Sequence, residues 1–501
     1  MTKKIFALML AAVLMLSALL LASCGNGSES SGASGESSSG DGESSQPARG
    51  FLNEEKVWNT DVNVLVYATD SHPFSTIIIP DEMNNEPIND AFYNRNDFIR
   101  EKYGLNLNLV TRPDPGDVVS LIRTNHESGV KDINVISLPL TYISTLGVEG
   151  LLHDFNSVGN EYLHLDQPWW DQSARRDLTL NGKLWFLAGD AIIEDDEATW
   201  AMYFNKDLIT SYGLENPYEL VNTNKWNLDK LYEMCKSVQY GGAMEFDPSA
   251  NSVWGIVTQC YDCYALMLGA NQPMVDTSGE EPKFRVDTEA NVAAFEDVMK
   301  LMLDSDICGV AEFYGAWNSG VYDKKRQIFA AGKSVFMPGM ISVVSGDELR
   351  NAEIHYGILP MPKADEFQDD YTTSVQCYWC QVMAVPANVV GTDLEATCYA
   401  LEAMAYYGME KVTPEYYNRT LSLKRFPDAE SAEMLDLIFR NRTFDLAGIF
   451  DFGTVNDNGA GTLYFYTTLL GSKTTDIISN WESRVSSFQY ALDDLLTAVS
   501  D

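Results

Sequence analysis

The stretch Val62-Asn-Val-Leu-Val-Tyr67 predicts a β-strand and begins the part of the sequence that decides the fold. The next strand is predicted at Leu105-Asn-Leu-Asn-Leu-Val110, because its apolar and polar residues alternate strictly. A third apolar run, Ile133-Asn-Val-Ile-Ser-Leu138, predicts another strand. The spacing of these runs leaves room for a helix between each pair.

Both intervening segments have helical patterns. Residues 89–103 carry apolar side chains at helical spacing and end before Gly104, which can adopt the left-handed conformation that stops a helix. A second helix is predicted over 117–127, after a proline-rich turn. Strand, helix, strand, helix, strand predicts a parallel α/β sheet. Because ligands of such sheets bind beyond the carboxyl ends of the strands, we expect the loop 139–144 at the edge of a site.

The N-terminus has the pattern of an export signal. Lys3 and Lys4 precede an apolar run over 5–22, and Leu21-Ala22-Ser23-Cys24 resembles the bacterial lipobox, in which the cysteine is lipidated. We therefore predict a signal peptide over 1–23, lipidation of Cys24, and a Gly/Ser-rich tether over 24–50. The alternative is an uncleaved anchor helix. Both interpretations place the rest of the chain outside the cytoplasmic membrane.

Composition excludes some classes of partner. The chain has 501 residues, 34 Lys+Arg, 72 Asp+Glu and a formal charge of -38, so binding to nucleic acid is not expected. Hydrophobic residues make up 45% of the chain, which predicts a folded body rather than disorder. Removal of Lys3 and Lys4 with the signal changes the charge from -38 to -40 and favours a neutral solute over an anionic one.

Seven cysteines follow position 24, and four of them form two CxxC pairs, Cys260/Cys263 and Cys377/Cys380. A zinc site or a thioredoxin-type redox pair would also use this spacing. The two pairs are more than a hundred residues apart, and the odd total argues against a complete disulfide framework. We expect small buried residues or a local disulfide, and we predict no metal site and no cofactor.

Several segments resemble, in their order, the motif series of family 1 extracellular solute-binding proteins. They are Gly150-Leu-Leu-His-Asp-Phe155, Asn181-Gly-Lys-Leu-Trp-Phe186, Tyr203-Phe-Asn-Lys-Asp-Leu208, Tyr212-Gly-Leu214, Phe329-Ala-Ala-Gly-Lys-Ser-Val-Phe-Met337 and Tyr356-Gly-Ile-Leu-Pro-Met-Pro-Lys363. Pro168-Trp-Trp-Asp171 and residues 430–446 resemble a clostridial-type subgroup of that family. The resemblance extends from about residue 60 to the C-terminus.

This resemblance implies a fold of the type II periplasmic-binding-protein kind. Two α/β lobes, each a mostly parallel sheet flanked by helices, would be joined by hinge crossings near 155–165 and 357. The first lobe would comprise 51–158 and 358–412, and the second 159–357 and 413–501.

The resemblance also implies a role. A lipoprotein on the extracellular face of the membrane would capture a carbohydrate, expected to be an oligosaccharide, and deliver it to an ABC permease. It would do so as a monomer.

A sugar site needs aromatic platforms beside polar side chains, because pyranose rings have apolar faces and equatorial hydroxyls. The candidates for ligand binding are Tyr142, Asp190, Trp200, Tyr203, Trp317, Gln376, Tyr378 and Trp379. Each aromatic side chain among them could equally belong to the core. The segment Ser137-Leu-Pro-Leu140 departs from the family, in which aromatic or acidic residues are frequent at this place.

Two other functions remain open. A secreted glycoside hydrolase would need two carboxylates about 5–10 Å apart across a cleft, but no hydrolase motif is present. We therefore predict no catalytic residues. A carbohydrate-binding adhesin would lack a closing cleft. The acidic run Glu194-Asp195-Asp196-Glu197 could bind calcium, but we expect it in a solvated loop, because it lacks the spacing of a calcium loop.

Overall fold

The computed structural model describes residues 52, 56–69, 77–159, 161–238, 240, 242–279, 281–421, 428–453 and 461–500. Side chains at 317 and 418–421 lie outside this description. The predicted signal peptide, Cys24 and the tether also lie outside it, so these three remain predictions.

A four-stranded sheet follows from the alternating pattern of the first part of the sequence. Its strands are β1 (Thr60–Tyr67), β2 (Leu105–Arg112), β3 (Val135–Pro139) and β12 (Gln381–Ala384), in the order β12-β3-β1-β2. β1 pairs in parallel with both β2 and β3, and only β12 is antiparallel to its neighbour β3. The three predicted strands and their parallel arrangement are therefore confirmed.

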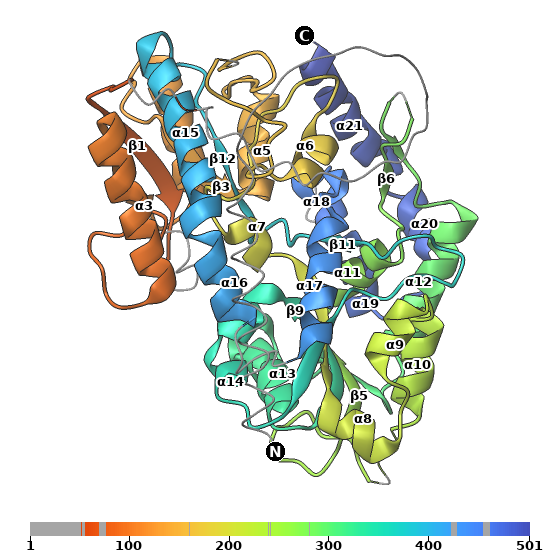
Figure 1. Ribbon diagram of the computed structural model, residues 1–501. Helices are drawn as coiled ribbons and strands as arrows, with labels where there is room; N and C mark the ends of the chain where they lie inside the picture. The colour runs from red at the N-terminus through yellow and green to blue at the C-terminus, as the bar shows by residue number, and fades with distance from the viewer. Residues whose placement is uncertain are drawn as a thin grey trace, which may run out of the picture. The chain divides into compact units, whose positions relative to one another are not determined.

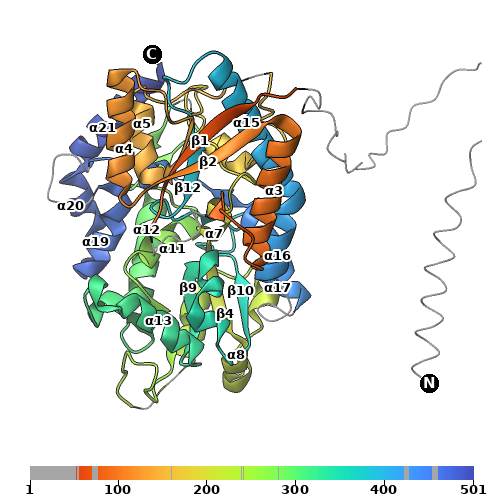
Figure 2. The same cartoon turned by 90° about the vertical axis from the view of Figure 1, so that its left-hand side faces the viewer.

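Helices cover both faces of this sheet. α4 (Pro115–Ser128) and α5 (Leu140–Val148) lie on one side, and α3 (Pro87–Tyr103) and α15 (Thr392–Lys411) lie side by side on the other (Figure 2). Gly104 ends α3 with a φ of 64°, a conformation that glycine adopts without steric cost. We call the sheet and these four helices the first lobe.

A five-stranded sheet forms the centre of the second lobe, in the order β10-β4-β9-β5-β8. Its strands are β4 (Trp200–Asn205), β5 (Trp254–Thr258), β8 (Cys308–Val310), β9 (Ser334–Met340) and β10 (Tyr356–Leu359). β9, β5 and β8 are parallel, whereas β4 is antiparallel to both β9 and β10. β10 lies at one edge of this sheet and β8 at the other.

Helices surround this sheet. The main ones are α8 (Lys206–Tyr212), α9 (Pro217–Asn222), α10 (Leu228–Lys236), α11 (Asp262–Gly269), α12 (Glu289–Met302), α13 (Val321–Ala330) and α17 (Ala429–Arg440). The side chain of Asn227 caps α10 and that of Thr288 caps α12, which are residue types that cap helices well.

Short elements complete the two lobes. The strands are β6 (Val275–Asp276), β7 (Lys283–Phe284), β11 (Thr373–Ser374) and β13 (Arg442–Thr443), and the 3-10 helices are η1 (Ala311–Phe313), η2 (Trp317–Ser319), η3 (Ile341–Ser345) and η4 (Thr462–Tyr464). The remaining helices are α6 (Gln172–Leu178), α7 (Glu194–Glu197), α14 (Asp347–Arg350), α16 (Thr413–Leu421), α18 (Leu446–Phe450), α19 (Phe465–Gly471), α20 (Ile477–Glu482) and α21 (Val485–Ser500).

Among the described residues, two segments lead from a strand of one of these sheets to a strand of the other, and we call them the crossing segments. The first is 188–199. It begins after Leu187, which bridges Met383 of β12 in the first lobe, and it leads through α7 into β4. The second is 371–380, which leads through β11 into β12. The two segments pair antiparallel at Thr199 and Val375. α7 lies between β12 and β9 in both views (Figures 1 and 2).

The C-terminal helices contact both lobes. α18 and α21 pack against α5 of the first lobe, whereas α19 packs against α11 and α20 against α12 of the second. The residue ranges of the two lobes derived from the sequence remain a prediction. Among the described residues, no helix is both long and apolar enough to cross a membrane.

All seven described cysteines are buried and carry free thiols. Burial raises the pKa of each thiol in the pair Cys260 and Cys263, and of each in the pair Cys377 and Cys380. Thiols of this kind are poor nucleophiles and poor metal ligands. These residues therefore belong to the core, which is one of the two alternatives that the sequence left open.

Candidate functional site

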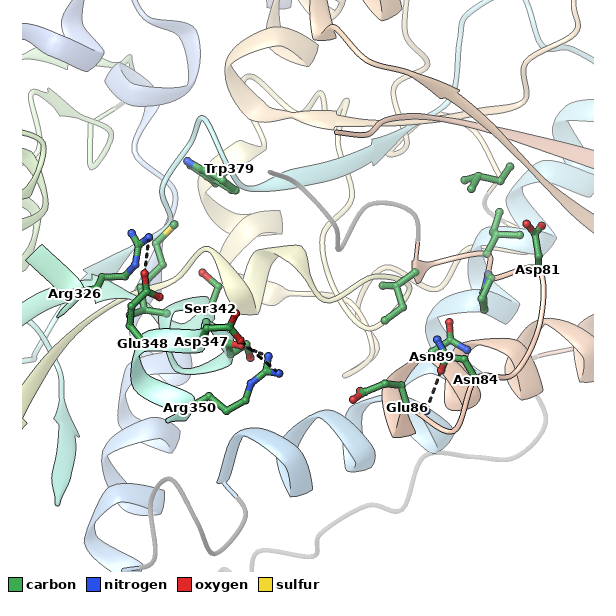
Figure 3. A pocket seen from close by; sticks show the side chains of 18 of the residues that line it. Asp81, Asn84, Glu86, Asn89, Arg326, Ser342, Asp347, Glu348, Arg350 and Trp379 are labelled. Carbon is green, nitrogen blue, oxygen red and sulfur yellow. Dashed lines mark hydrogen bonds and ion pairs between the residues drawn. The ribbon is translucent and has the colours of Figure 1, made fainter. Parts of the chain in front are cut away.

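A pocket of about 1170 Å³ is lined by residues of both lobes (Figure 3). On the first lobe the lining comes from the segment after β1 and from the start of α3. On the second it comes from the end of β9, η3, α13 and α14. Met340, the last residue of β9, is part of this lining, so the pocket lies at the carboxyl end of a parallel strand. Ligands of α/β sheets bind at such ends.

The first-lobe wall is polar and held by local hydrogen bonds. Asn84 Oδ1 accepts a hydrogen bond from the Glu86 backbone nitrogen at 2.9 Å, and the Asn84 backbone nitrogen donates to Asp90 Oδ1 at 2.9 Å. Asn89 Nδ2 donates to the Glu82 carbonyl oxygen at 2.9 Å. These bonds stabilise the turn before α3 in a shape that presents carboxylate and amide groups to the pocket.

The second-lobe wall contains two arginines that are paired with acids. Arg326 Nη2 lies 3.4 Å from Glu348 Oε1, and Arg350 Nη1 lies 3.9 Å from Asp347 Oδ1. Figure 3 shows these two pairs on one side of the pocket and the polar first-lobe residues on the other. Arg350 Nη2 also donates to the Ser345 carbonyl oxygen, so each arginine has part of its hydrogen-bonding capacity satisfied by protein.

The charge of the lining is negative. Its described acids are Asp81, Glu82, Glu86, Asp347 and Glu348, against the two guanidinium groups of Arg326 and Arg350. A negative field repels anionic solutes and is compatible with a neutral one. This local charge has the same sign as the net charge of the chain.

Trp379 is the aromatic side chain among the described lining residues and belongs to the second crossing segment. Its backbone nitrogen donates to Gln376 Oε1 at 2.8 Å and to the Gln376 carbonyl oxygen at 2.9 Å. The Gln376 backbone nitrogen in turn donates to the Ala198 carbonyl oxygen at 2.9 Å. Of the predicted residues with described side chains, Trp379 alone lines this pocket, and Gln376 holds the turn that presents it.

Tyr142 and Tyr378 lie together at the adjoining end of the first sheet. Their hydroxyl oxygens are 3.4 Å apart and their ring centroids 5.8 Å apart. Burial raises the pKa of Tyr142, and the hydrogen bond with Tyr378 raises it further. Tyr464 of η4 is 37% exposed, and its ring centroid lies 6.2 Å from that of Tyr261.

Trp200 and Tyr203 are placed in the core by the structure. Trp200 is 2% exposed and stacks on Tyr261 at 5.9 Å. Tyr203 is fully buried in β4 and donates a hydrogen bond from its hydroxyl to the Met340 carbonyl oxygen at 2.9 Å. Trp200 pairs through its backbone with Met340, so both residues contact the strand residue that lines the pocket. The side chain of Trp317, which begins η2, lies outside the described part of the chain.

Asp190 lies against the junction of α15 and α16 and does not line the pocket. Its carboxylate accepts a hydrogen bond from the Thr413 hydroxyl, and its backbone nitrogen donates to the Trp169 carbonyl oxygen at 2.9 Å. Burial raises the pKa of Asp190 to about 7, although the bond from Thr413 lowers it. The residue therefore joins the first crossing segment to the helix that leads into the second lobe.

Three of the four acids at 194–197 are buried and Asp196 is half-buried, so the expectation of a solvated loop was wrong. The run forms α7, and its Asp195 and Asp196 bind the guanidinium of Arg442. A sequence window cannot show this, because the compensating charge lies far along the chain. Among the described residues, no group of three or more His, Cys, Asp or Glu side chains is arranged to hold a metal ion.

Solved structures of other proteins resemble this chain in fold, whereas searches by sequence find no match. No family model matches the chain, and no curated protein matches it in sequence. The ABC substrate-binding protein of Listeria monocytogenes, solved in complex with cycloalternan, is 13% identical with a TM-score of 0.54, over 88% of this chain and 99% of its own.

Two further solved structures are similar to the same extent. A sugar transporter of Rhizobium etli, in an open conformation, is 15% identical with a TM-score of 0.54, over 88% of this chain and 99% of its own. UgpB of Mycobacterium tuberculosis, in complex with glycerophosphocholine, is 14% identical with a TM-score of 0.54, over 87% of this chain and 98% of its own. At these identities the likeness shows the fold alone. The chain therefore has the two-lobed α/β fold of periplasmic binding proteins.

Proposed function

We propose that the chain is the solute-binding component of an ABC importer and captures a neutral carbohydrate, expected to be an oligosaccharide, between its two lobes. The observation that carries this proposal is the pocket lined from both lobes, with Trp379 on a crossing segment. Aromatic rings beside carboxylates and amides are what a pyranose needs, because the ring face stacks and the hydroxyls form hydrogen bonds.

The fold and the pocket are compatible with reversible capture. A ligand that contacts both walls stabilises the arrangement in which the walls approach each other. Exclusion of water on closing would strengthen the hydrogen bonds to the sugar hydroxyls. The similar solved structures are described as substrate-binding or transport proteins, which supports a binding role without chemistry.

The rival function is hydrolysis of a glycoside, which needs a pair of carboxylates on either side of the bond. The acids of the pocket make this rival testable. We would titrate the full chain, purified in mild detergent, with neutral oligosaccharides by calorimetry, and analyse each mixture for cleaved products. Saturable binding with intact sugar supports capture. Steady release of shorter sugars would establish the hydrolase, and absence of binding across the panel would contradict a carbohydrate ligand.

The same proposal includes a lipid anchor at Cys24 on the extracellular face of the membrane, from where a monomer would deliver its ligand to permease subunits. The support is the lipobox-like Leu21-Ala22-Ser23-Cys24 and the Gly/Ser-rich tether that follows. Mass spectrometry of the N-terminal peptide tests the anchor. A peptide that begins at Cys24 with added acyl mass is expected, whereas an unmodified peptide that continues upstream of Cys24 would contradict it.

A further inference from the structure

Arg442 is a buried cation bound to three carboxylates. Its side chain is 7% exposed, Nη1 lies 2.8 Å from Asp196 Oδ1, and Nη2 lies 3.2 Å from Asp195 Oδ2. Nη2 also donates to Asp171 Oδ2. Burial disfavours the charged form of Arg442, but the combined attraction of the three carboxylates outweighs it and raises the pKa of the guanidinium.

The groups that meet at Arg442 come from different parts of the fold. Asp195 and Asp196 belong to α7 in the first crossing segment, and Asp171 is the N-cap of α6, where it accepts from the Ala174 nitrogen at 2.8 Å. Arg442 itself is in β13, which pairs in parallel with β11 of the second crossing segment. Arg442 therefore joins both crossing segments, α7 through its side chain and β11 through its backbone.

The junction continues to the pocket through backbone hydrogen bonds. Ala198, directly after α7, accepts from the Gln376 nitrogen at 2.9 Å, and Gln376 holds the turn of Trp379. Displacement of α7 would therefore move the aromatic side chain that lines the pocket. A planar guanidinium can donate to three carboxylates at once, whereas a lysine ammonium is a point charge that cannot reproduce this fork.

We propose that Arg442 is the positioning residue of the hinge and holds the two crossing segments together, so that Trp379 stays in register with the second-lobe wall. This inference rests on the proposed binding function only for its effect on affinity. Loosening of the crossing segments reduces the fraction of molecules in the binding-competent arrangement, and the apparent affinity falls by that fraction.

The first test needs no ligand. Hydrogen exchange of the full chain in mild detergent would compare the natural protein with R442K and with the control R123K. Arg123 pairs with Glu149 through two hydrogen bonds on an exposed surface, remote in sequence from both crossing segments. R442K is expected to accelerate exchange about tenfold or more in peptides covering 193–200 and 371–381. Exchange in α12 should stay unchanged, because the crossing segments can open locally without unfolding of the whole chain.

Uniform acceleration over the whole chain, or no change in the peptides of the crossing segments, would overturn the proposal. If R442K does not fold, D196N takes its place, because Asp196 is the most exposed of the three partners at 20%. R123K is expected to leave both peptides unchanged.

The second test uses any oligosaccharide that the calorimetric panel identifies. R442K should weaken binding several-fold in the natural background but have no further effect in a Trp379→Ala background, because it acts through that side chain. Equal effects in both backgrounds would overturn the positioning role. If no sugar binds at all, the proposed function fails, and the exchange measurement still decides the hinge proposal.

Discussion

The Nη1 atom of Arg442 lies 2.8 Å from Oδ1 of Asp196, although 246 residues separate the two in the sequence. This contact explains how two adjacent carboxylates of the acidic run can lie inside a strongly negative chain. A cation from a distant strand compensates Asp195 and Asp196, whereas the charge of Arg95 acts on Glu194. The contact between Arg442 and Asp196 also places the compensating charge where the two lobes are connected, so its removal has consequences for both stability and binding.

Replacing Arg442 by methionine should lower the free energy of unfolding by about 3–5 kcal/mol, because it leaves three buried carboxylates without a counter-charge. The matched change Arg123→Met removes the ion pair with Glu149, whose two side chains are 44% and 38% exposed. It should lower the free energy of unfolding by no more than about 1 kcal/mol. Urea unfolding of both variants measures the difference. Similar small losses in the two would show that the junction at Arg442 contributes little.

The stability of the protein should depend on Asp190 between about pH 4 and pH 7. Its pKa is raised from 3.8 to about 7 by burial, so the folded chain binds this proton more tightly than the unfolded chain. The resulting stabilisation is present below pH 4 and is lost as the pH rises through 7. Asp190→Asn keeps a neutral group and can still accept from Thr413, so the variant should gain stability relative to the natural protein as the pH rises. A difference that does not change between pH 5 and pH 8 would contradict this.

Two adjacent lysines of α13 offer a comparison of a buried with an exposed ion pair. Lys325 Nζ lies 2.8 Å from Asp262 Oδ2 with side chains 6% and 0% exposed, whereas Lys324 lies 4.0 Å from Asp247 with 44% and 46%. Lys325→Met should cost about 3–5 kcal/mol, because Asp262 is left buried without its partner. Lys324→Met should cost less than about 1 kcal/mol. Denaturant unfolding of the two variants measures the loss of unfolding free energy in each. Equal losses would refute the assignment of Lys325 and Asp262 as a buried pair.

Gly408 tests the close packing of α15 on the first crossing segment. A Cβ atom at this position would lie 1.7 Å from the Asp190 carbonyl oxygen, a contact that backbone movement alone can relieve. Gly408→Ala should therefore destabilise the protein by about 3 kcal/mol or more. Gly471→Ala, at the end of α19 with nothing within 4 Å of the added Cβ, should be neutral or stabilise by up to about 1 kcal/mol. Thermal unfolding of both variants gives the answer, and a tolerated Gly408→Ala would mean that the helix packs less tightly.

The first lobe could be predicted from the sequence because its signals are local. Leu105-Asn-Leu-Asn-Leu-Val110 alternates along a strand whose leucines are more buried than its asparagines, and Gly104 ends the preceding helix in a left-handed conformation. The cap at Asn227 is also a local signal. The place where the chain crosses between sheets depends instead on long-range pairing, such as that of Leu187 with Met383 and of Thr199 with Val375. No short window of sequence contains that information.

The candidate site was harder to predict than the fold, because aromatic residues serve the core and a binding surface equally well. Trp379 and Trp200 are both large aromatic residues near the crossing segments, yet Trp379 lines the pocket and Trp200 is 2% exposed. The polar wall at Asp81, Asn84 and Asn89 carries no motif and was missed. A cluster of polar residues immediately before a predicted helix, after the first strand of an α/β sheet, is the signal that could have indicated it.

The measurement that tests the central claim most directly is calorimetric titration of three forms of the full chain with the tightest-binding neutral oligosaccharide of the panel. The natural protein should bind saturably and leave the sugar intact. Trp379→Ala should bind at least about tenfold more weakly, because an aromatic platform is lost. Tyr490→Ala, a change at a residue 66% exposed on α21 and outside the described pocket lining, should bind like the natural protein. Equal affinities of the natural protein and Trp379→Ala would show that the ligand does not bind in this pocket.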